Sequence, residues 1–182
     1  MIEATIFAAL AMALSFVPSG VGYFSISLGM IPITLYAIRR GTSKGIFAGF
    51  LWGILHLLVG KADILAFWQG FIEYFIAYAF IGLAGFFSTP IKHHMRKGNI
   101  GRVRIFLTVA AFTGTIGRYV WHFIAGVIFW GEYAPEGMSP VVNSLVVNGS
   151  SALFTALTTS IVLIFLQVSS KRLFVVDRIN YK

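Results

Sequence analysis

The chain has 182 residues, of which 58% are hydrophobic and 11% are charged. Soluble domains carry roughly 25% charged residues, so this composition excludes an ordinary soluble protein and indicates an integral membrane protein. The chain has no cysteine, which excludes disulfide bonds and thiolate metal sites, and we expect no cofactor. The formal net charge is +8. Whether it indicates an anionic partner or membrane topology depends on where the charged residues lie along the chain.

Apolar segments follow one another along the chain, with no polar stretch long enough to form a soluble domain. Most have roughly 15 to 25 residues, the length that a helix needs to cross the hydrocarbon core of a bilayer. We expect helices at Ile2–Val17, Leu28–Ile38, Gly45–Val59, Phe67–Phe87, Ile105–Trp130 and Val141–Val168. The sequence therefore predicts an all-α integral membrane protein, a single domain of six transmembrane helices over residues 1–182.

Basic residues lie between these predicted helices. All of the 14 lysine and arginine residues except Lys61 and Arg118 fall in segments 39–44, 92–104 and 171–182, which are alternate connections of the bundle and its C-terminal end. Because loops rich in Lys and Arg stay on the cytoplasmic side, both termini and these connections are predicted to be cytoplasmic. The positive charge thus reflects membrane topology, and we expect no nucleic-acid partner.

Small residues recur at four-residue spacing on the first and third predicted helices. In lipid, such stripes let two helices approach closely. They are Ala4 with Ala8 and Ala9 with Ala13 on the first helix, and Gly45, Gly49 and Gly53 on the third. We expect the glycine stripe to pack inside the bundle, whereas the first helix is compatible either with packing or with contact to a partner subunit. No glycine belongs to a Walker A pattern, so the chain has no ATPase of its own.

A few polar residues interrupt the apolar segments: Glu73, Arg118, His122, Asn143 and Asn148. An ionised side chain in the middle of a bilayer costs about 2.5–3.5 kcal/mol on insertion scales, so it usually faces a cavity, a partner or a ligand. Structural alternatives exist for single residues. Glu73 could pair with Arg118, and His122 could be an interhelical hydrogen-bond partner.

Helical spacing nevertheless places these groups together. Arg118, His122, Gly126 and Trp130 follow at intervals of four residues and form one stripe, in which Gly126 leaves room beside the imidazole. Glu73 and Asn148 are expected in the outer halves of their own helices. Together these residues offer a carboxylate, an imidazole, amides and an indole face, which attracts cations. This set suits a planar, aminated, cationic small molecule.

Four stretches of the sequence resemble a known family. They are "MIPITLYAIRRGTSKGIFAGFLWG", "GFIEYFIAYAF", "GRYVWHFIAGVIFWGEYAPEG" and "NSLVVNGS". These stretches are similar to the thiamine-specific S component (ThiT type) of energy-coupling factor transporters. The resemblance implies a multi-pass protein of the bacterial cell membrane that captures extracellular thiamine with high affinity. It also implies partners: a membrane coupling subunit and two cytoplasmic ATPases.

The resemblance assigns roles to individual residues. It implies that Glu73 holds the aminopyrimidine ring with Tyr74 beside it. It places His122 and Trp130 on either side of the thiazolium ring. Asn148 is implied to complete the polar contacts.

The remaining assignments concern the edge of the site and the partner. The resemblance places Arg118 at the pocket, and it matches Ala4 and Ala8 to the small-residue motif that meets the coupling subunit. The sequence departs from the family at two positions, since Asn143 replaces an expected tyrosine and Tyr23 replaces an expected tryptophan of a lid.

Two alternatives to thiamine binding stay open at this point. The first is an S component for another vitamin or for a thiamine precursor. The second is an intramembrane hydrolase with Ser150 or Ser151 as nucleophile and His122 as base, which requires the serine and the histidine to be within hydrogen-bond reach. No nucleophile motif surrounds these serines, so we expect a protein that is not an enzyme.

Overall fold

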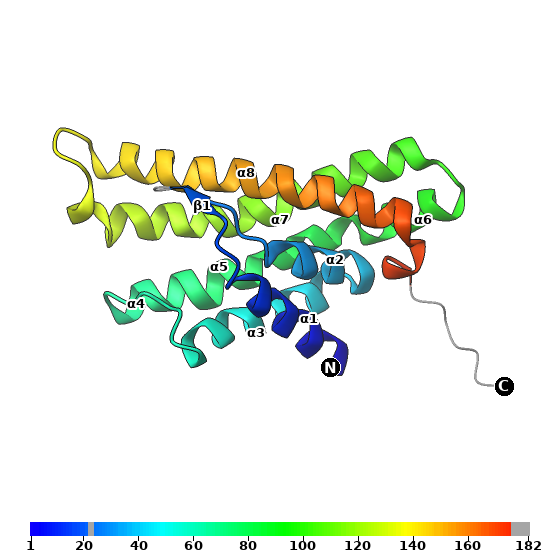
Figure 1. The fold of residues 1–182 in the computed structure, drawn as a ribbon, viewed down its shortest axis with the longest axis horizontal. Helices are drawn as coiled ribbons and strands as arrows, with labels where there is room; N and C mark the ends of the chain where they lie inside the picture. The colour runs from blue at the N-terminus through cyan, green and yellow to red at the C-terminus, as the bar shows by residue number, and fades with distance from the viewer. Residues whose placement is uncertain (22–23, 176–182) are drawn as a thin grey trace.

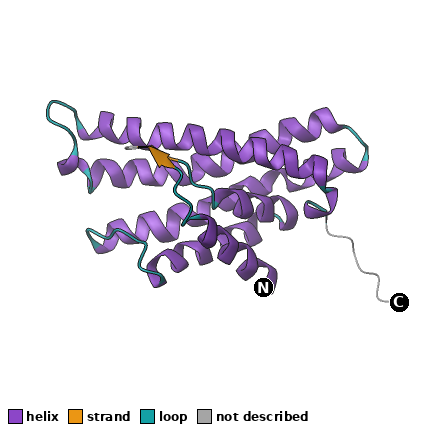
Figure 2. Cartoon of the chain, in the orientation of Figure 1, coloured by secondary structure: helices purple, strands orange, loops and turns teal. Residues whose placement is uncertain are grey.

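The computed structural model describes residues 1–21 and 24–175, and this part of the chain is almost entirely helical (Figures 1 and 2). Its helical segments form six rods. They are α1 (Ile2–Leu14), α2 (Met30–Arg40), α3 (Thr42–Leu58), the composite rod Phe67–Arg96, α7 (Ile100–Ile128) and α8 (Pro140–Ser169). Short 3-10 turns follow α7 at Gly131–Tyr133 and α8 at Lys171–Leu173. The predicted all-α class and the count of six helices are confirmed for the described residues.

Three of the rods are long and apolar enough to cross a membrane, namely Phe67–Arg96, α7 and α8. Helices α1 and α3 are apolar but shorter, and α2 has only 11 residues. Figure 1 shows α7 and α8 running side by side along the long axis of the bundle, with the shorter helices packed beside them. The described part of the molecule therefore combines three long rods with the three shorter helices α1, α2 and α3.

The basic segments were predicted as loops, and this prediction is wrong for most of their residues. Arg39 and Arg40 form the last turn of α2, and Lys44 lies in the first turn of α3. Between these helices stands a single residue, Gly41, at φ 89°, a backbone angle that glycine adopts without steric cost. The prediction failed because hydropathy detects only the part of a helix that lies in lipid. Arg39 and Arg40 suit the last turn of α2, because cations at a helix C-terminus interact favourably with the macrodipole.

The rod Phe67–Arg96 changes its winding along its length, which the sequence did not predict. It begins as α4 (Phe67–Gly70), continues as a π-helix (η1, Phe71–Ile76), and returns to α5 (Ala77–Phe80). A 3-10 stretch (η2, Ile81–Phe87) then leads into α6 (Ser88–Arg96). Isolated π-helical turns often mark functional sites.

The glycine stripe of α3 packs inside the bundle, as predicted. A Cβ atom at Gly53 would overlap the carbonyl oxygen of Tyr74, and one at Gly49 would overlap the carbonyl oxygen of Tyr78. The backbone of α3 therefore lies directly against η1 and α5, which is the close approach that small residues permit in membranes.

The predicted partner contact of α1 through Ala4 and Ala8 is contradicted by the structure. Ala4 is 1% exposed and Ala8 is 0% exposed, and both belong to the core cluster that includes Trp52. The stripe thus packs the chain against itself. The exposed face of α1 instead carries small residues at Ala9 and Ala13.

A two-stranded antiparallel hairpin follows α1, with β1 (Gly20–Val21) paired to β2 (Phe24–Ser25). The segment from β2 onward is bound to α8. The backbone N–H of Ser25 donates to Ser151 Oγ at 3.2 Å, and that of Ser27 donates to Thr155 Oγ1 at 3.0 Å. Tyr23, the predicted lid residue, lies outside the described residues.

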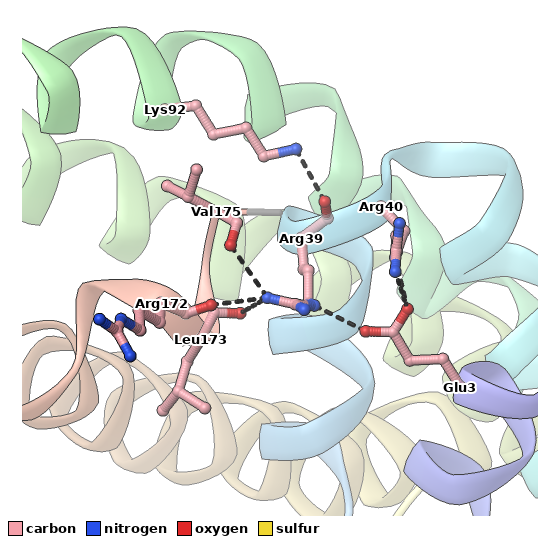
Figure 3. A network of polar contacts seen from close by, with 7 residues as sticks. All are labelled: Glu3, Arg39, Arg40, Lys92, Arg172, Leu173 and Val175. Atoms are coloured by element: carbon pink, nitrogen blue, oxygen red, sulfur yellow. Dashed lines mark hydrogen bonds and ion pairs between the residues drawn. The ribbon is translucent and has the colours of Figure 1, made fainter. Parts of the chain in front are cut away.

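One polar network joins the first turn of α1 to the segment that follows α8 (Figure 3). Arg39 Nε donates to Glu3 at 2.6 Å, and Arg39 Nη1 donates to the carbonyl oxygens of residues 172, 173 and 175. Arg40 also pairs with Glu3, and Lys92 Nζ donates to the carbonyl oxygen of Arg39 at 2.7 Å. The N-terminal turn of α1 and the segment after α8 therefore meet at one end of the bundle, as expected if both termini are on the same side of the membrane.

Candidate ligand-binding site

The carboxylate of Glu73 is held in the bundle by two hydrogen bonds. Its Oε1 accepts from Trp130 Nε1 at 3.0 Å, and its Oε2 accepts from Gln69 Nε2 at 2.7 Å. Glu73 is 8% exposed and lies in the π-helix η1. An indole N–H and an amide NH2 can only donate, so this environment suits an ionised carboxylate that still has lone pairs for a further donor.

Gln69 fixes the orientation of this carboxylate. Its Oε1 accepts from the backbone N–H of Leu65 at 3.0 Å, and its Nε2 donates to the carbonyl oxygen of Asp63 at 3.1 Å as well as to Glu73. The two backbone partners define which end of the amide is oxygen. Gln69 is 0% exposed, so it connects the loop after α3 rigidly to the acidic group of the site.

A cavity of about 440 Å³ opens beside Glu73. Six of the predicted site residues line it: Glu73, His122, Gly126, Trp130, Asn143 and Asn148. Tyr133 and Pro135, from the segment after α7, line it as well. The structure therefore brings together residues from the composite rod, α7 and α8 that are up to 75 positions apart in the chain.

The α8 wall of this cavity is ordered by hydrogen bonds to α7 and within α8. Ser144 Oγ donates to the carbonyl oxygen of Phe123 at 2.8 Å, and Asn148 Nδ2 donates to Ser144 Oγ at 3.1 Å. Gly126 makes this contact possible, because a Cβ atom there would overlap Ser144 Oγ and lie 3.0 Å from Asn148 Nδ2. The space beside Gly126 is therefore partly occupied by α8 side chains, which the spacing argument did not foresee.

A second cavity, of about 550 Å³, adjoins the first and shares His122 with it. Tyr74 and Arg118 line this second cavity and not the first. The hydroxyl of Tyr74 accepts a hydrogen bond from the backbone N–H of Asp63 at 2.9 Å. Tyr74 and Gln69 thus both hold the loop after α3 against the site.

Arg118 does not form an ion pair with Glu73, since the only ion pairs within residues 1–21 and 24–175 are those of Glu3. Its guanidinium carbon lies 4.2 Å from the ring centroid of Tyr78, 5.0 Å from that of Trp52 and 5.4 Å from that of Tyr119. Each such cation–π contact contributes about 0.5–2 kcal/mol, depending on desolvation. The structural alternative of a Glu73–Arg118 pair is therefore wrong, and aromatic faces stabilise the buried cation instead.

Sequence reasoning missed this aromatic cage of Trp52, Tyr78 and Tyr119. Only Tyr78 could have been placed near the site from the sequence, because it follows Tyr74 by four residues on the same rod. Trp52 belongs to another helix, and in an apolar segment a tryptophan is not distinguishable from ordinary packing.

The hydrolase alternative is not supported by the geometry. Ser150 Oγ donates to the backbone carbonyl oxygen of Val146 at 2.5 Å, and Ser151 Oγ accepts from the backbone N–H of Ser25. The Nε2 atom of His122 accepts from Arg118 Nε at 3.1 Å. Neither serine is hydrogen-bonded to the imidazole, so the arrangement required for nucleophilic activation is not formed.

Comparisons with known proteins agree with this architecture. Residues 1–175 match the family described as "Thiamine transporter protein (Thia_YuaJ)". The chain is 40% identical over 179 residues to the thiamine transporter ThiT of Lacticaseibacillus paracasei, covering 96% of this chain and 89% of that protein. It is 30% identical over 154 residues to the thiamine transporter ThiT of Bacillus subtilis, covering 85% of this chain and 80% of that protein.

A solved structure of ThiT from Listeria monocytogenes has the same fold. The TM-score is 0.94 at 44% sequence identity, and the match covers 96% of each chain. Sequence and structure therefore agree over almost the whole length, and the helices described above are those of a multi-pass bacterial membrane protein. The chain belongs to the thiamine transporter protein family.

Proposed function

We propose that this protein binds extracellular thiamine with high affinity and is the substrate-binding S component of an energy-coupling factor transporter. The observation that carries the proposal is the cavity beside Glu73, in which a carboxylate held only by donors faces an imidazole and an indole. Thiamine has an aminated pyrimidine ring and a permanently cationic thiazolium ring, and this cavity offers an acceptor for the first and aromatic faces for the second.

Within this proposal the lining residues have separate roles. Glu73 accepts hydrogen bonds from the aminopyrimidine, and His122 and Trp130 flank the thiazolium. Asn143 and Asn148 supply amide contacts from α8. An asparagine at position 143 offers hydrogen bonds in place of the ring face that a tyrosine would supply.

The partners in this proposal are a membrane coupling subunit and two cytoplasmic ATPases. The chain contains no Walker A pattern, so accumulation against a gradient requires an ATPase supplied by another protein. The family and its relatives are named transporters, and the protein is a transport protein and not an enzyme.

A titration of the detergent-purified protein with thiamine tests the proposal, with tryptophan fluorescence as the readout. Thiamine quenches the emission if it lies against Trp130. Trp130→Phe removes most of this quenching, whereas Trp68→Phe, on the 64% exposed tryptophan of α4, retains it. Quenching that persists in Trp130→Phe would place the ligand elsewhere.

An S component for a thiamine precursor is the second candidate, because an aminopyrimidine alone would satisfy Glu73. Competition with separate pyrimidine and thiazole fragments distinguishes the two ligands. Thiamine specificity requires both fragments to bind more weakly than the whole molecule, whereas a precursor site binds one fragment as tightly as thiamine.

A further inference from the structure

Arg118 is the only lysine or arginine within the six apolar segments predicted from the sequence, and its hydrogen bonds point to a role beyond ligand contact. Its Nε donates to His122 Nε2 at 3.1 Å, and its Nη1 donates to Ser27 Oγ at 2.7 Å. Arg118 is 6% exposed, and Tyr78, Trp52 and Tyr119 surround the guanidinium. The side chain is thus held in one position, with one N–H directed at the imidazole.

The contact with His122 restricts the protonation of that ring. A guanidinium in a protein is always a donor, so the histidine nitrogen that faces it must be an acceptor and carries no proton. A neutral imidazole has one proton, which then resides on Nδ1. An imidazolium would bring two N–H groups and two positive charges together at this contact.

We propose that Arg118 is a positioning residue that acts through His122 and keeps this ring as the neutral Nδ1–H tautomer. The consequence for the ligand rests on the proposed function, because His122 lines the cavity beside Glu73. A neutral ring can lie against a cationic thiazolium, whereas an imidazolium would repel it. The aromatic cage stabilises the charge of Arg118, and Arg118 itself lines the second cavity and not the cavity beside Glu73.

Two substitutions separate the donor from the charge. In Arg118→Gln, the amide nitrogen occupies the same place along the side chain as Nε of arginine, so a neutral donor still reaches His122. In Arg118→Met, the side chain is about as long as that of glutamine but has neither a hydrogen-bond donor nor a charge. Both variants remove a buried cation, whose desolvation penalty disappears with it, so both are expected to fold.

Nitrogen NMR of the full chain in detergent or nanodiscs, with 15N-labelled histidine, reports the tautomer directly. The chain has four histidines, and the spectrum of His122→Gln identifies the signals of His122. Wild type and Arg118→Gln are expected to show a protonated Nδ1 and an unprotonated Nε2. Arg118→Met is expected to show a mixture of tautomers or an imidazolium, and its dissociation constant for thiamine rises by about tenfold, equivalent to about 1.4 kcal/mol.

Ser27→Ala is the matched control, because it removes the other hydrogen bond of Arg118 and leaves the contact with His122. Its spectrum should be that of wild type. A protonated Nε2 in the wild type, or an unchanged tautomer in Arg118→Met, would overturn the proposal. These spectra are recorded without ligand, so a wild-type protein that fails to bind thiamine would refute the proposed function and leave the tautomer assignment standing.

Discussion

Glu73 decides what the site can recognise, because the amide NH2 of Gln69 and the indole N–H of Trp130 that contact its carboxylate can only donate hydrogen bonds. The free lone pairs of the carboxylate therefore require a ligand with donors of its own, which an aminated ring provides. The absence of an ion pair with Arg118 among the described residues also means that Glu73 is not part of a structural salt bridge. Its charge is available to a cationic ligand.

Glu73→Gln should lower thiamine affinity by roughly ten- to a hundredfold, since a hydrogen bond to a charged group contributes about 1.5–3 kcal/mol. The new NH2 group also faces a donor from either Gln69 or Trp130, so the unliganded protein should melt at a slightly lower temperature. Calorimetric titration and a thermal melt on one preparation check both effects. Glu132→Gln, at an exposed residue of the 3-10 turn after α7, is the matched control. Unaltered affinity in Glu73→Gln would exclude the binding role.

At the scale of elements, the π-helix η1 and the glycines of α3 determine where Glu73 and Tyr74 lie. Gly53→Ala should push the carbonyl of Tyr74 away and lower the stability of the protein by about 1–3 kcal/mol, the typical cost of overpacking. Because Glu73 precedes Tyr74 in η1, the same displacement should also weaken thiamine binding. Gly101→Ala has open space around it and should be neutral or slightly stabilising. Equal thiamine affinity in the two variants would show that η1 tolerates displacement.

Substitutions on the buried and on the exposed face of α1 can distinguish packing within the bundle from contact with a partner. Ala8→Trp should prevent folding, because Ala8 is fully buried in the core. Ala9→Trp changes the exposed face and should leave thiamine binding by the purified protein intact. If this face meets the coupling subunit, uptake by cells that express Ala9→Trp is lost. Normal uptake would assign the coupling contact to another helix.

Helix number and most of the site were predictable from the sequence, because both depend on local patterns. Apolar length predicts a spanning helix, and spacing of four residues places Arg118, His122 and Gly126 on one face. The cage around Arg118 was not predictable, since Trp52 and Tyr78 reach it from other rods. The burial of Ala4 and Ala8 likewise depends on how α1 is rotated against α3, which a stripe of small residues does not specify.

At the scale of the whole molecule, the Arg39 network joins the first turn of α1 to the segment that follows α8. Arg39→Met removes the ion pair with Glu3 and the bonds to the carbonyl oxygens of residues 172, 173 and 175. We expect a loss of about 1.5–3 kcal/mol of stability, the range for hydrogen bonds to a charged group. Arg40→Met removes only a contact with Glu3 and should lower the melting temperature less. Equal melting temperatures for the two variants would contradict a special role of Arg39.

At the same scale, the chain contains no Walker A pattern, and this predicts what the isolated protein does with thiamine. In vesicles that contain only this protein, labelled thiamine should bind in proportion to the amount of protein and should not accumulate when ATP is enclosed, because the chain has no Walker A pattern. Glu73→Gln vesicles give the background, since binding is weakened while the fold and lipid content are the same. If the proposed partners are correct, adding a membrane coupling subunit and two ATPases should convert binding into ATP-dependent accumulation. Concentrative uptake by the isolated chain, sensitive to Glu73→Gln, would instead mean that this protein transports thiamine without an ATP-driven partner.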